Sequence, residues 1–392
     1  MGDKEPNNNN KEQVMIEPQS CFFDDLIIEE ILTRLPIKSI LRFKSVSKQW
    51  YTTLSSSNFA NAHLIKSPFS HPSAPIETLF IKCGNNFYLS LCDDDQISGN
   101  FQDNLVKLDV DFANDENFCL LTGCCNGLIC LTLGRDKYFI IWNPATRKAH
   151  KYESDGFSNH VNFSDWPTLD VVLGFGYASS VDDYKYVRIV TRCRRKEKCN
   201  IVHIFSLREK KWRKIDFDHD DDHLIPIGEA VLVKEKLYMI AVAGIYCERV
   251  VIVSFDLGLE KFEITKFNIR RDDFLGVMGG CLSINRYKGK NDRFMHIHES
   301  PTTMKSICLP KGLRLDKFSK MIGFTRTGKL FVTATIIDDF KNWKTRKILG
   351  LVDTCTKPME YSMLMIADEG VNIARYVPSL VSPFPIEELS EA

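Results

Sequence analysis

The most concentrated apolar pattern of the chain lies near its N-terminus, over residues 22–64. Leucine and isoleucine recur three and four positions apart over residues 26–35, which predicts a short helix that is apolar nearly all round. Pro36 ends this helix, because proline lacks an amide donor and disfavours helix at the residue before it. Two more short helices are expected over residues 37–43 and 46–54. A domain this small cannot bury all of these side chains, so we expect an exposed apolar patch, which usually marks an interface.

Beyond Pro68, short runs of β-branched and aromatic residues alternate with glycine, aspartate and asparagine turns, which predicts an all-β domain. The runs recur loosely, with landmark turns at Asn143, Ser206, Phe255 and Asp353. These turns lie about fifty residues apart, or twice that, as in kelch-like propeller blades. A four-stranded unit leaves edges and faces bare, so its neighbours must cover them, and we expect one ring-like domain.

Two weaker units extend the repeat. A degraded copy spans residues 280–310, and residues 76–112 supply strands for a sixth unit at the N-terminal end. The copies are too diverged to count, so the pattern leaves the number of blades open.

Composition narrows the functional classes. Lysine plus arginine (51) equals aspartate plus glutamate (51), so no net field favours nucleic acid or an anionic membrane. No apolar run approaches the roughly 20 residues of a membrane span, and the polar N-terminus is unlike a secretory signal. Residues 1–17 are expected to be a disordered leader. The 13 cysteines fall mostly in apolar runs, which favours reduced thiols and a cytoplasmic or nuclear protein.

Candidate metal ligands are few. Residues 216–223 concentrate carboxylates with His219 and His223, but lack the glycine spacing of a calcium loop, so a solvated loop is the preferred interpretation. His296 and His298 share one face of a predicted strand without a completing ligand. The cysteines between residues 119 and 130 lack zinc-site spacing and are expected in the core. We predict no metal and no cofactor.

Other motifs also favour structural roles. The sequence GFGY at residues 174–177 lacks the third glycine and the following helix of a dinucleotide loop, and predicts a strand bend. Asn143–Pro144 favours a turn. The basic run 192–199 is expected at a hairpin tip, with a nuclear signal or a patch for an acidic partner as alternatives. No nucleophile elbow, phosphate loop or paired-carboxylate site stands out, which argues against an enzyme.

The run LPIKSILRFKSVSKQW resembles the F-box of plant F-box proteins, with their Leu-Pro, Ser-Leu, Arg-Phe, Val, Lys and Trp pattern. The matching positions are Leu35, Pro36, Ser39, Ile40, Arg42, Phe43, Val46, Lys48 and Trp50. The resemblance implies docking onto a Skp-type adaptor, which links the F-box to a cullin carrying a ubiquitin-conjugating enzyme. The residues alone predict an apolar helical patch that fits a partner's groove, or that packs on the rest of the chain.

Later segments resemble the F-box-associated domain of the same plant family. They are GCCNGLICL, IWNPATRK, GFGY, DDYKYVRIV and VHIFSLREKKWRKI, in the order that is usual for the family. The S-locus F-box proteins of pollen are one candidate subgroup, which would imply ribonucleases as targets.

The expected fold is therefore α+β and multidomain: a small three-helix F-box over residues 18–65, followed by an all-β, β-propeller-like domain over residues 75–385. The resemblance implies a non-catalytic substrate-recognition subunit of a Skp-cullin-F-box ubiquitin ligase, which tethers an unknown protein target. The alternatives are a scaffold that binds the adaptor without degrading its partners, and an enzyme with a metal site at residues 216–223.

The site predictions follow from this assignment. Trp50 is expected inside the helical module rather than at the adaptor. The residues expected to bind the adaptor are Ile28, Ile31, Leu35, Pro36, Ile40, Leu41 and Phe43. Loops on a rigid β scaffold carry recognition, so candidate target-binding loops are 93–104, 153–168, 192–199, 216–227 and 268–276.

Overall fold

The computed structural model describes most of the chain between residues 26 and 384. The described residues are 26–67, 70–71, 74–92, 101–110, 112, 119–134, 136–156, 169–194, 197–217, 224–244, 249–265, 269–271, 273–287, 294–298, 304–308, 316–339, 344–353, 361–367 and 371–384. The expected leader, residues 1–17, lies outside them, as do parts of all five candidate loops.

The N-terminal part is a helical module that ends at Lys66. Its elements are η1 (Ile27–Ile31), η2 (Leu32–Arg34), α2 (Ile37–Phe43), α3 (Lys48–Ser55) and α4 (Ser57–Lys66). The first segment is irregular, because a π turn in η1 passes into a 3-10 turn in η2. The residue before Pro36 is extended, as a proline requires, and α2 has the predicted bounds.

Serine N-caps determine where the next two helices begin. α3 begins two residues later than predicted, because Ser47 Oγ accepts a hydrogen bond from the Trp50 amide at 3.1 Å. Ser56 Oγ likewise accepts from the Phe59 amide at 3.2 Å and starts α4. The sequence pattern does not separate α4 as a helix of its own, because the serine run 55–57 interrupts the apolar periodicity.

The rest of the described chain folds into six four-stranded antiparallel sheets. Blade 1 comprises β24 (Asn372–Arg375), β1 (Thr78–Cys83), β2 (Asn86–Leu91) and β3 (Leu105–Leu108), with η3 (Phe101–Asn104) leading into β3. Blade 2 comprises β4 (Cys119–Cys125), β5 (Leu128–Leu133), β6 (Tyr138–Asn143) and β7 (Lys148–Glu153). Blade 3 comprises β8 (Leu169–Ala178), β9 (Asp183–Arg194), β10 (Glu197–Ser206) and β11 (Lys211–Asp216).

The second half repeats the same sheet order. Blade 4 comprises β12 (Ile225–Val233), β13 (Lys236–Ala243), β14 (Arg249–Asp256) and β15 (Lys261–Thr265). Blade 5 comprises β16 (Phe274–Met278), β17 (Cys281–Tyr287), β18 (Phe294–His298) and β19 (Met304–Cys308). Blade 6 comprises β20 (Asp316–Phe324), β21 (Leu330–Asp339), β22 (Lys344–Val352) and β23 (Tyr361–Ala367). The all-β, propeller-like prediction is therefore confirmed, and the blade number left open by the sequence is six.

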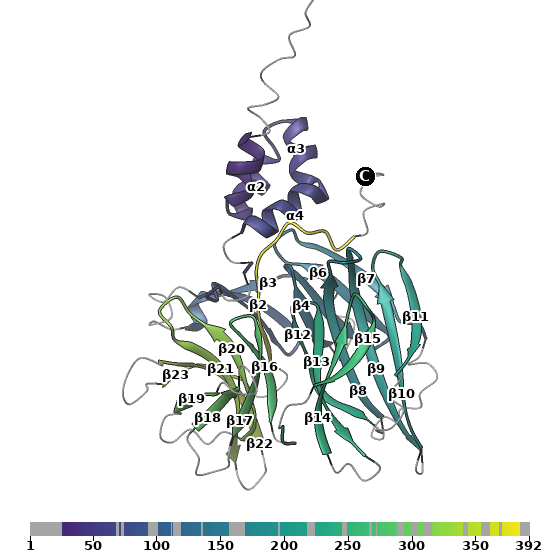
Figure 1. The fold of residues 1–392 in the computed structure, drawn as a ribbon. Coiled ribbons are helices and arrows are strands. Elements are labelled where there is room, and N and C mark those ends of the chain that lie inside the picture. Colours follow the sequence, from purple (N-terminus) through teal and green to yellow (C-terminus); the bar gives the residue numbers. More distant parts are fainter. Residues whose placement is uncertain are drawn as a thin grey trace, which may run out of the picture.

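The ring closes by pairing the two ends of the propeller. The first strand of each blade contacts the first strands of its two neighbours around the axis. In blade 1 this first strand is β24, from the C-terminal end, which pairs antiparallel with β1 so that Ile373 lies opposite Ile81. Figure 1 shows the helical module at one end of this ring, with the yellow C-terminal segment passing beneath α4.

A repeated turn explains three of the four landmarks in the sequence, although the turn of blade 4 starts at Asp256, one residue after the landmark Phe255. Asn143, Ser206 and Asp256 end the third strand of blades 2, 3 and 4, and each side chain accepts hydrogen bonds from amides two or three residues later. The fourth residue after each has a positive φ: Arg147 (57°), Lys210 (53°) and Glu260 (55°). The predicted hairpin at 192–199 is also confirmed, because β9 and β10 pair there.

The prediction of a strand bend at residues 174–177 is wrong. β8 runs through this segment in unbroken register with β9. Its glycines instead allow close packing between blades, since a Cβ at Gly176 would lie 2.6 Å from Leu257 Cδ1 and 2.7 Å from Leu232 Cδ1. Glycine is needed here for space rather than for chain direction.

Ring closure predicts a strong effect of Ile373→Ala. The Ile373 side chain is 6% exposed and belongs to the core between blades 1 and 6. We expect the free energy of unfolding in urea to fall by about 2–4 kcal/mol, because the variant leaves a cavity at the closing strand. Ile65→Ala, at a site 80% exposed on α4, is the matched control and should change it by less than about 0.5 kcal/mol. Equal effects of the two variants would contradict this role of β24.

Candidate functional site

The helical module keeps several apolar side chains outside its own core. Leu32, Ile37 and Ile40 are buried among the helices, with Leu54 and Phe59. The exposed apolar side chains of the module are Leu26, Ile31, Val46, Tyr51 and Ile65. A small module that leaves these side chains in water has the surface expected of a docking element.

The seven residues predicted to bind the adaptor fall into three classes of burial. Ile31 is 54% exposed, and Pro36 is also exposed. Ile40 is 0% exposed, so its side chain supports the helices from inside and has no free surface. The half-buried members, which pack on the edge of the core, are Ile28, Leu35, Leu41 and Phe43.

Polar contacts fix the shape of this surface. His63 of α4 lies with Nε2 2.8 Å from the carbonyl oxygen of Leu35, directly before Pro36. Lys66 donates to the carbonyl oxygen of Glu29 at 2.7 Å and pairs with the Glu30 carboxylate at 3.1 Å. The pKa of Glu30 is lowered, first by the hydrogen bond from Lys66. The last helix therefore holds the irregular first segment in place. Trp50 is half-buried at the edge of the same core, edge-on to the Phe43 ring at 5.8 Å between centroids, so its place inside the module stays a prediction.

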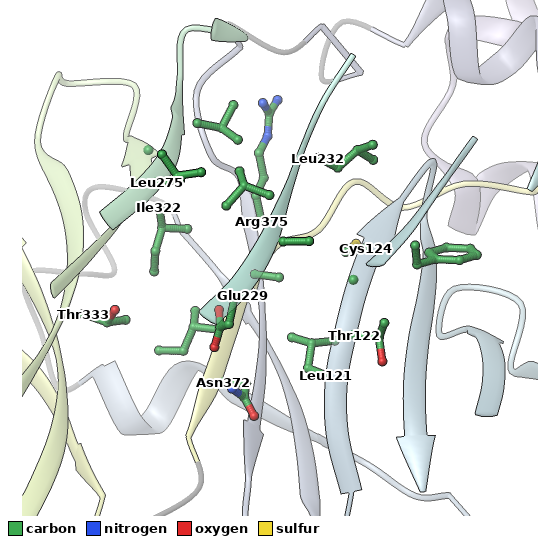
Figure 2. Close-up of a pocket in the computed structure, with 18 of the residues that line it drawn as sticks. Leu121, Thr122, Cys124, Glu229, Leu232, Leu275, Ile322, Thr333, Asn372 and Arg375 are labelled. Carbon is green, nitrogen blue, oxygen red and sulfur yellow. The ribbon is translucent and has the colours of Figure 1, made fainter. Parts of the chain in front are cut away.

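A second feature is a cavity of about 1070 Å³ on the axis of the ring. Figure 2 shows side chains from the innermost strands around it. Its walls are mainly leucine, isoleucine and valine, and Ser70, Ala74 and Val377 line it from the two segments that connect the ring with the helices. Polar lining residues include Thr122, Glu229, Thr333, Lys347, Asn372 and Arg375.

A bulge in β12 places Glu229 in this cavity. The register with β13 shifts between Ile227 and Val231, and Gly228 adopts a φ of +78°. Bulges of this kind re-aim a side chain away from the regular alternation. The predicted candidate residues did not include Glu229, although a glycine inside an apolar strand pattern is a recognised bulge signal.

The cysteines predicted in the core have unreactive surroundings. Burial raises the pKa of both Cys124 and Cys125 to about 12, so neither thiol ionises near neutral pH. Only Cys130 of this group lies in the core as predicted: it is fully buried, and burial raises its pKa as well, whereas Cys119, Cys124 and Cys125 are half-buried. These thiols act as small apolar side chains in blade 2.

The comparisons with known proteins agree with this architecture. The family model of the F-box associated beta propeller domain matches residues 78–304, which is more than half of the chain. The model of the F-box domain matches residues 23–61, and thus the helical module. The chain is a plant F-box protein with an F-box-associated β-propeller domain.

Individual relatives are distant. An F-box/kelch-repeat protein of Arabidopsis thaliana is 27% identical over 288 residues, which cover 68% of this chain and 72% of the relative. The F-box protein CPR1 of the same plant is 24% identical over 343 residues, 77% of each chain. The match covers 66%, 57% and 46% of the length of three further F-box proteins from this plant.

Among solved structures, the six-bladed β-propeller lectin of the fungus Aleuria aurantia aligns with a TM-score of 0.38 and 9% identity. The alignment covers 75% of this F-box protein and 97% of the lectin. A likeness this weak carries no information about binding.

The structure bears on two other classes of site. Among the described residues of the F-box protein, no cluster of histidine, cysteine, aspartate or glutamate is arranged to hold a metal ion. Most of the acidic loop, residues 218–223, lies outside the described chain. No described helix is both long and apolar enough to cross a membrane.

Buried ion pairs join blade 2 to blade 3. Arg188, which is 0% exposed, donates to Asp155 Oδ1 at 2.5 Å and also pairs with Asp136. Its guanidinium lies 5.0 Å from the Trp212 ring, and His203 Nδ1 contacts the other oxygen of Asp155. Burial raises the pKa of Asp136 despite the nearby Arg188. These groups pair with one another, which is typical of structural ion pairs rather than of a binding site.

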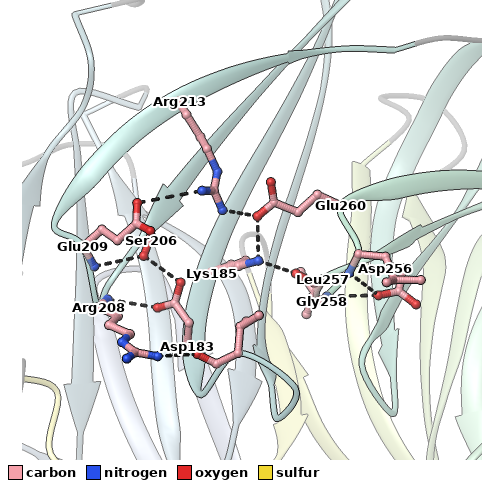
Figure 3. Close-up of polar contacts among 12 residues, drawn as sticks. Asp183, Lys185, Ser206, Arg208, Glu209, Arg213, Asp256, Leu257, Gly258 and Glu260 are labelled. Carbon is pink, nitrogen blue, oxygen red and sulfur yellow. Dashed lines mark hydrogen bonds and ion pairs between the residues drawn. The ribbon is translucent and has the colours of Figure 1, made fainter.

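A similar set of contacts joins blade 3 to blade 4 (Figure 3). Lys185 donates to the carbonyl oxygen of Leu257 at 2.5 Å and to Glu260 at 2.6 Å, and Arg213 pairs with the same carboxylate. The polar side chains between blades thus hold the scaffold together.

The cluster at Asp155 predicts a pH-dependent stability. Burial alone would raise the Asp155 pKa, but hydrogen bonds and charge from His203 and Arg188 lower it well below its usual range. The stabilisation is therefore complete above the unfolded pKa of about 3.9 and is lost as the pH falls below that value. Asp155→Asn should lower the free energy of unfolding by about 1–3 kcal/mol at pH 7, with a smaller difference from wild type below pH ~4.

The matched control is Glu209→Gln, which removes an exposed carboxylate 3.8 Å from Arg213. It should change the free energy of unfolding by less than about 0.5 kcal/mol at either pH. Urea unfolding at both pH values measures the two variants. A deficit of Asp155→Asn that is the same at both pH values would show that the ion pairs are not its cause.

Proposed function

We propose that this chain is the substrate-recognition subunit of a Skp-cullin-F-box ubiquitin ligase. The observation that carries the proposal is the apolar surface of the F-box module, where Ile31 and Pro36 are exposed on helices fixed against a separate β-propeller. The family match supports the same assignment, since the F-box domain implies a Skp-type adaptor. The protein target is not identified by these features.

The proposed adaptor surface runs from the first helical segment to the start of α2. Ile31 and Pro36 supply exposed contacts, and the half-buried Ile28, Leu35, Leu41 and Phe43 line its edge. An apolar helical face of this kind binds by filling a groove of the partner. Ile40 contributes by keeping the helices packed.

The proposed target-binding surface is the end of the propeller away from the helices. The β6–β7 turn contacts the C-terminal segment beneath α4, and Leu207 of the β10–β11 turn packs near Leu64 of α4. Because β7 and β11 start at these turns, both strands run away from the helices. Loops 153–168 and 216–227 follow these two strands, and we propose that they contact the target with loops 192–199 and 268–276.

The role proposed for the chain is non-catalytic. A target held on the propeller shares one assembly with the ubiquitin-conjugating enzyme that the adaptor and cullin bring. Tethering raises the effective concentration of the target lysine near the ubiquitin thioester. The chain then accelerates transfer by binding alone.

Adaptor binding is tested with Ile31→Asp in the full chain. A carboxylate at this exposed apolar site should weaken binding of a purified Skp-type adaptor at least ~10-fold, because the charge loses water in the groove. Isothermal titration calorimetry measures the affinity. Ile65→Asp makes the same change on α4 at a site that is 80% exposed, and should leave the affinity within about twofold.

Two results decide the proposal. Failure of the wild-type chain to bind the adaptor would overturn it. If the adaptor binds, ubiquitin-remnant peptides are compared in plant cells that express wild type or Ile31→Asp. Proteins ubiquitinated only with wild type support the receptor function, whereas an identical set with both chains indicates a scaffold that does not direct degradation.

A further inference from the structure

The segment after the closing strand lies between the F-box and the propeller. We call residues 376–384 the C-terminal strap; it appears in yellow beneath α4 in Figure 1. Leu380 is buried in the core of the F-box module, together with Ile37 and Ile40. The next residue, Val381, is buried in the core shared by blades 2 and 3, where Leu64 of α4 also packs. Adjacent strap residues thus enter the cores of both domains.

Hydrogen bonds attach the strap to blade 2. The Asn143 amide Nδ2 donates to the carbonyl oxygens of Ser379 at 3.0 Å and Val381 at 2.7 Å. Ser379 Oγ donates to the carbonyl oxygen of Asn126 at 2.6 Å, and the Tyr152 hydroxyl donates to that of Pro383 at 3.0 Å. These contacts hold the backbone on both sides of Leu380.

The strap also lies close against the β4–β5 turn. A Cβ at Gly127 would lie 2.3 Å from Ser379 Oγ and 2.7 Å from the carbonyl oxygen of Val377. Ala145, in the β6–β7 turn, packs against the F-box core, and its amide donates to the Tyr376 hydroxyl at 3.2 Å. Both turns of blade 2 therefore contact the strap, and the β6–β7 turn also contacts the helices.

Asn143 differs from the residues at the same place in the next blades. Asn143, Ser206 and Asp256 all accept amide hydrogen bonds within their own turns. A carboxylate such as Asp256 satisfies that turn without any donor. The turn itself does not need the two hydrogen bonds that Asn143 Nδ2 donates to the strap. The residue with an amide donor therefore occurs at the turn that contacts the strap.

Only the first residue of the strap takes part in ring closure. β24 ends at Arg375, the Tyr376 amide then donates to the carbonyl oxygen of Thr78 at 3.0 Å, and the Tyr376 ring packs in the core between blades 1 and 2. The contacts of Ser379, Leu380 and Val381 lie beyond this pairing, at the junction between the F-box and blades 2 and 3.

We propose that the C-terminal strap, with Asn143 as its positioning residue, fixes the orientation of the F-box on the propeller. The orientation itself does not depend on the proposed function; only its effect on ubiquitin transfer rests on that function. In a ligase, a fixed orientation holds the adaptor surface and the far end of the propeller at one distance, which sets how often a bound target meets the ubiquitin thioester.

Hydrogen exchange of the full chain tests the inference with Asn143→Asp. The variant retains an acceptor for the turn, as in blade 4, but loses the donor to the strap. Amide exchange in residues 376–384 and in α4 should accelerate about tenfold or more, because both parts open locally once the strap is released. Exchange in blades 4 and 5 should not change.

Two further variants keep the test decisive if a buried carboxylate unfolds blade 2. Asn143→Ser places the residue of the blade 3 turn at this position without adding charge, and its single, shorter hydroxyl can make at most one of the two hydrogen bonds to the strap, so exchange there should still accelerate. Asp256→Asn makes the reverse change at a turn that the strap does not reach, and should leave exchange of the strap and α4 unchanged. Small-angle scattering should show a broader range of shapes for Asn143→Ser than for wild type and Asp256→Asn.

The inference is overturned if Asn143→Ser leaves exchange of the strap and α4 at the wild-type rate, or if Asp256→Asn accelerates it equally. Titration of the same variants with the purified Skp-type adaptor separates this result from the proposed function. Loss of adaptor binding by every chain, wild type included, would reject the ligase function and leave the exchange result intact.

Discussion

The pairing of β24 with β1 is the interaction on which the rest of the structure depends. It joins strands from opposite ends of the propeller, so that each innermost strand meets its two neighbours around one axis. An open ring would expose strand edges and one face of the core between blades 1 and 6. The same pairing brings the start of β1 and the end of β24 to the end of the ring where the helices lie, and it thereby determines where the F-box is attached.

Rigidity follows from how the blades meet. Glycines in β8 let blade 3 approach the leucines of blade 4, and the buried pairs of Arg188 and Lys185 satisfy polar groups between blades. Charges used in this way are not free for chemistry, since each is paired with a neighbour inside the scaffold. The innermost strands leave an axial cavity between them, into which Glu229 projects from a bulge.

The two domains differ in how much of their apolar side chains they expose to water. The F-box leaves apolar side chains such as Ile31 in water because its small core cannot bury them, whereas the large propeller buries its apolar side chains between sheets. The C-terminal strap contacts both domains, with Leu380 in the core of the F-box and Val381 in the core between blades 2 and 3.

The sequence by itself determined the local features: α2 with its proline boundary, the all-β nature of the propeller, the turns at Asn143 and Ser206, and the F-box motif. Each depends on residues close together in the chain, where periodicity, capping and proline geometry act directly. Only the tertiary structure decided the C-terminal strand that closes blade 1, the burial of Ile40, the reason for the glycines of β8, and the strap. These depend on contacts between segments far apart in the chain, which no local pattern encodes: Leu380 has no apolar partner nearby in sequence that would place it in the F-box core.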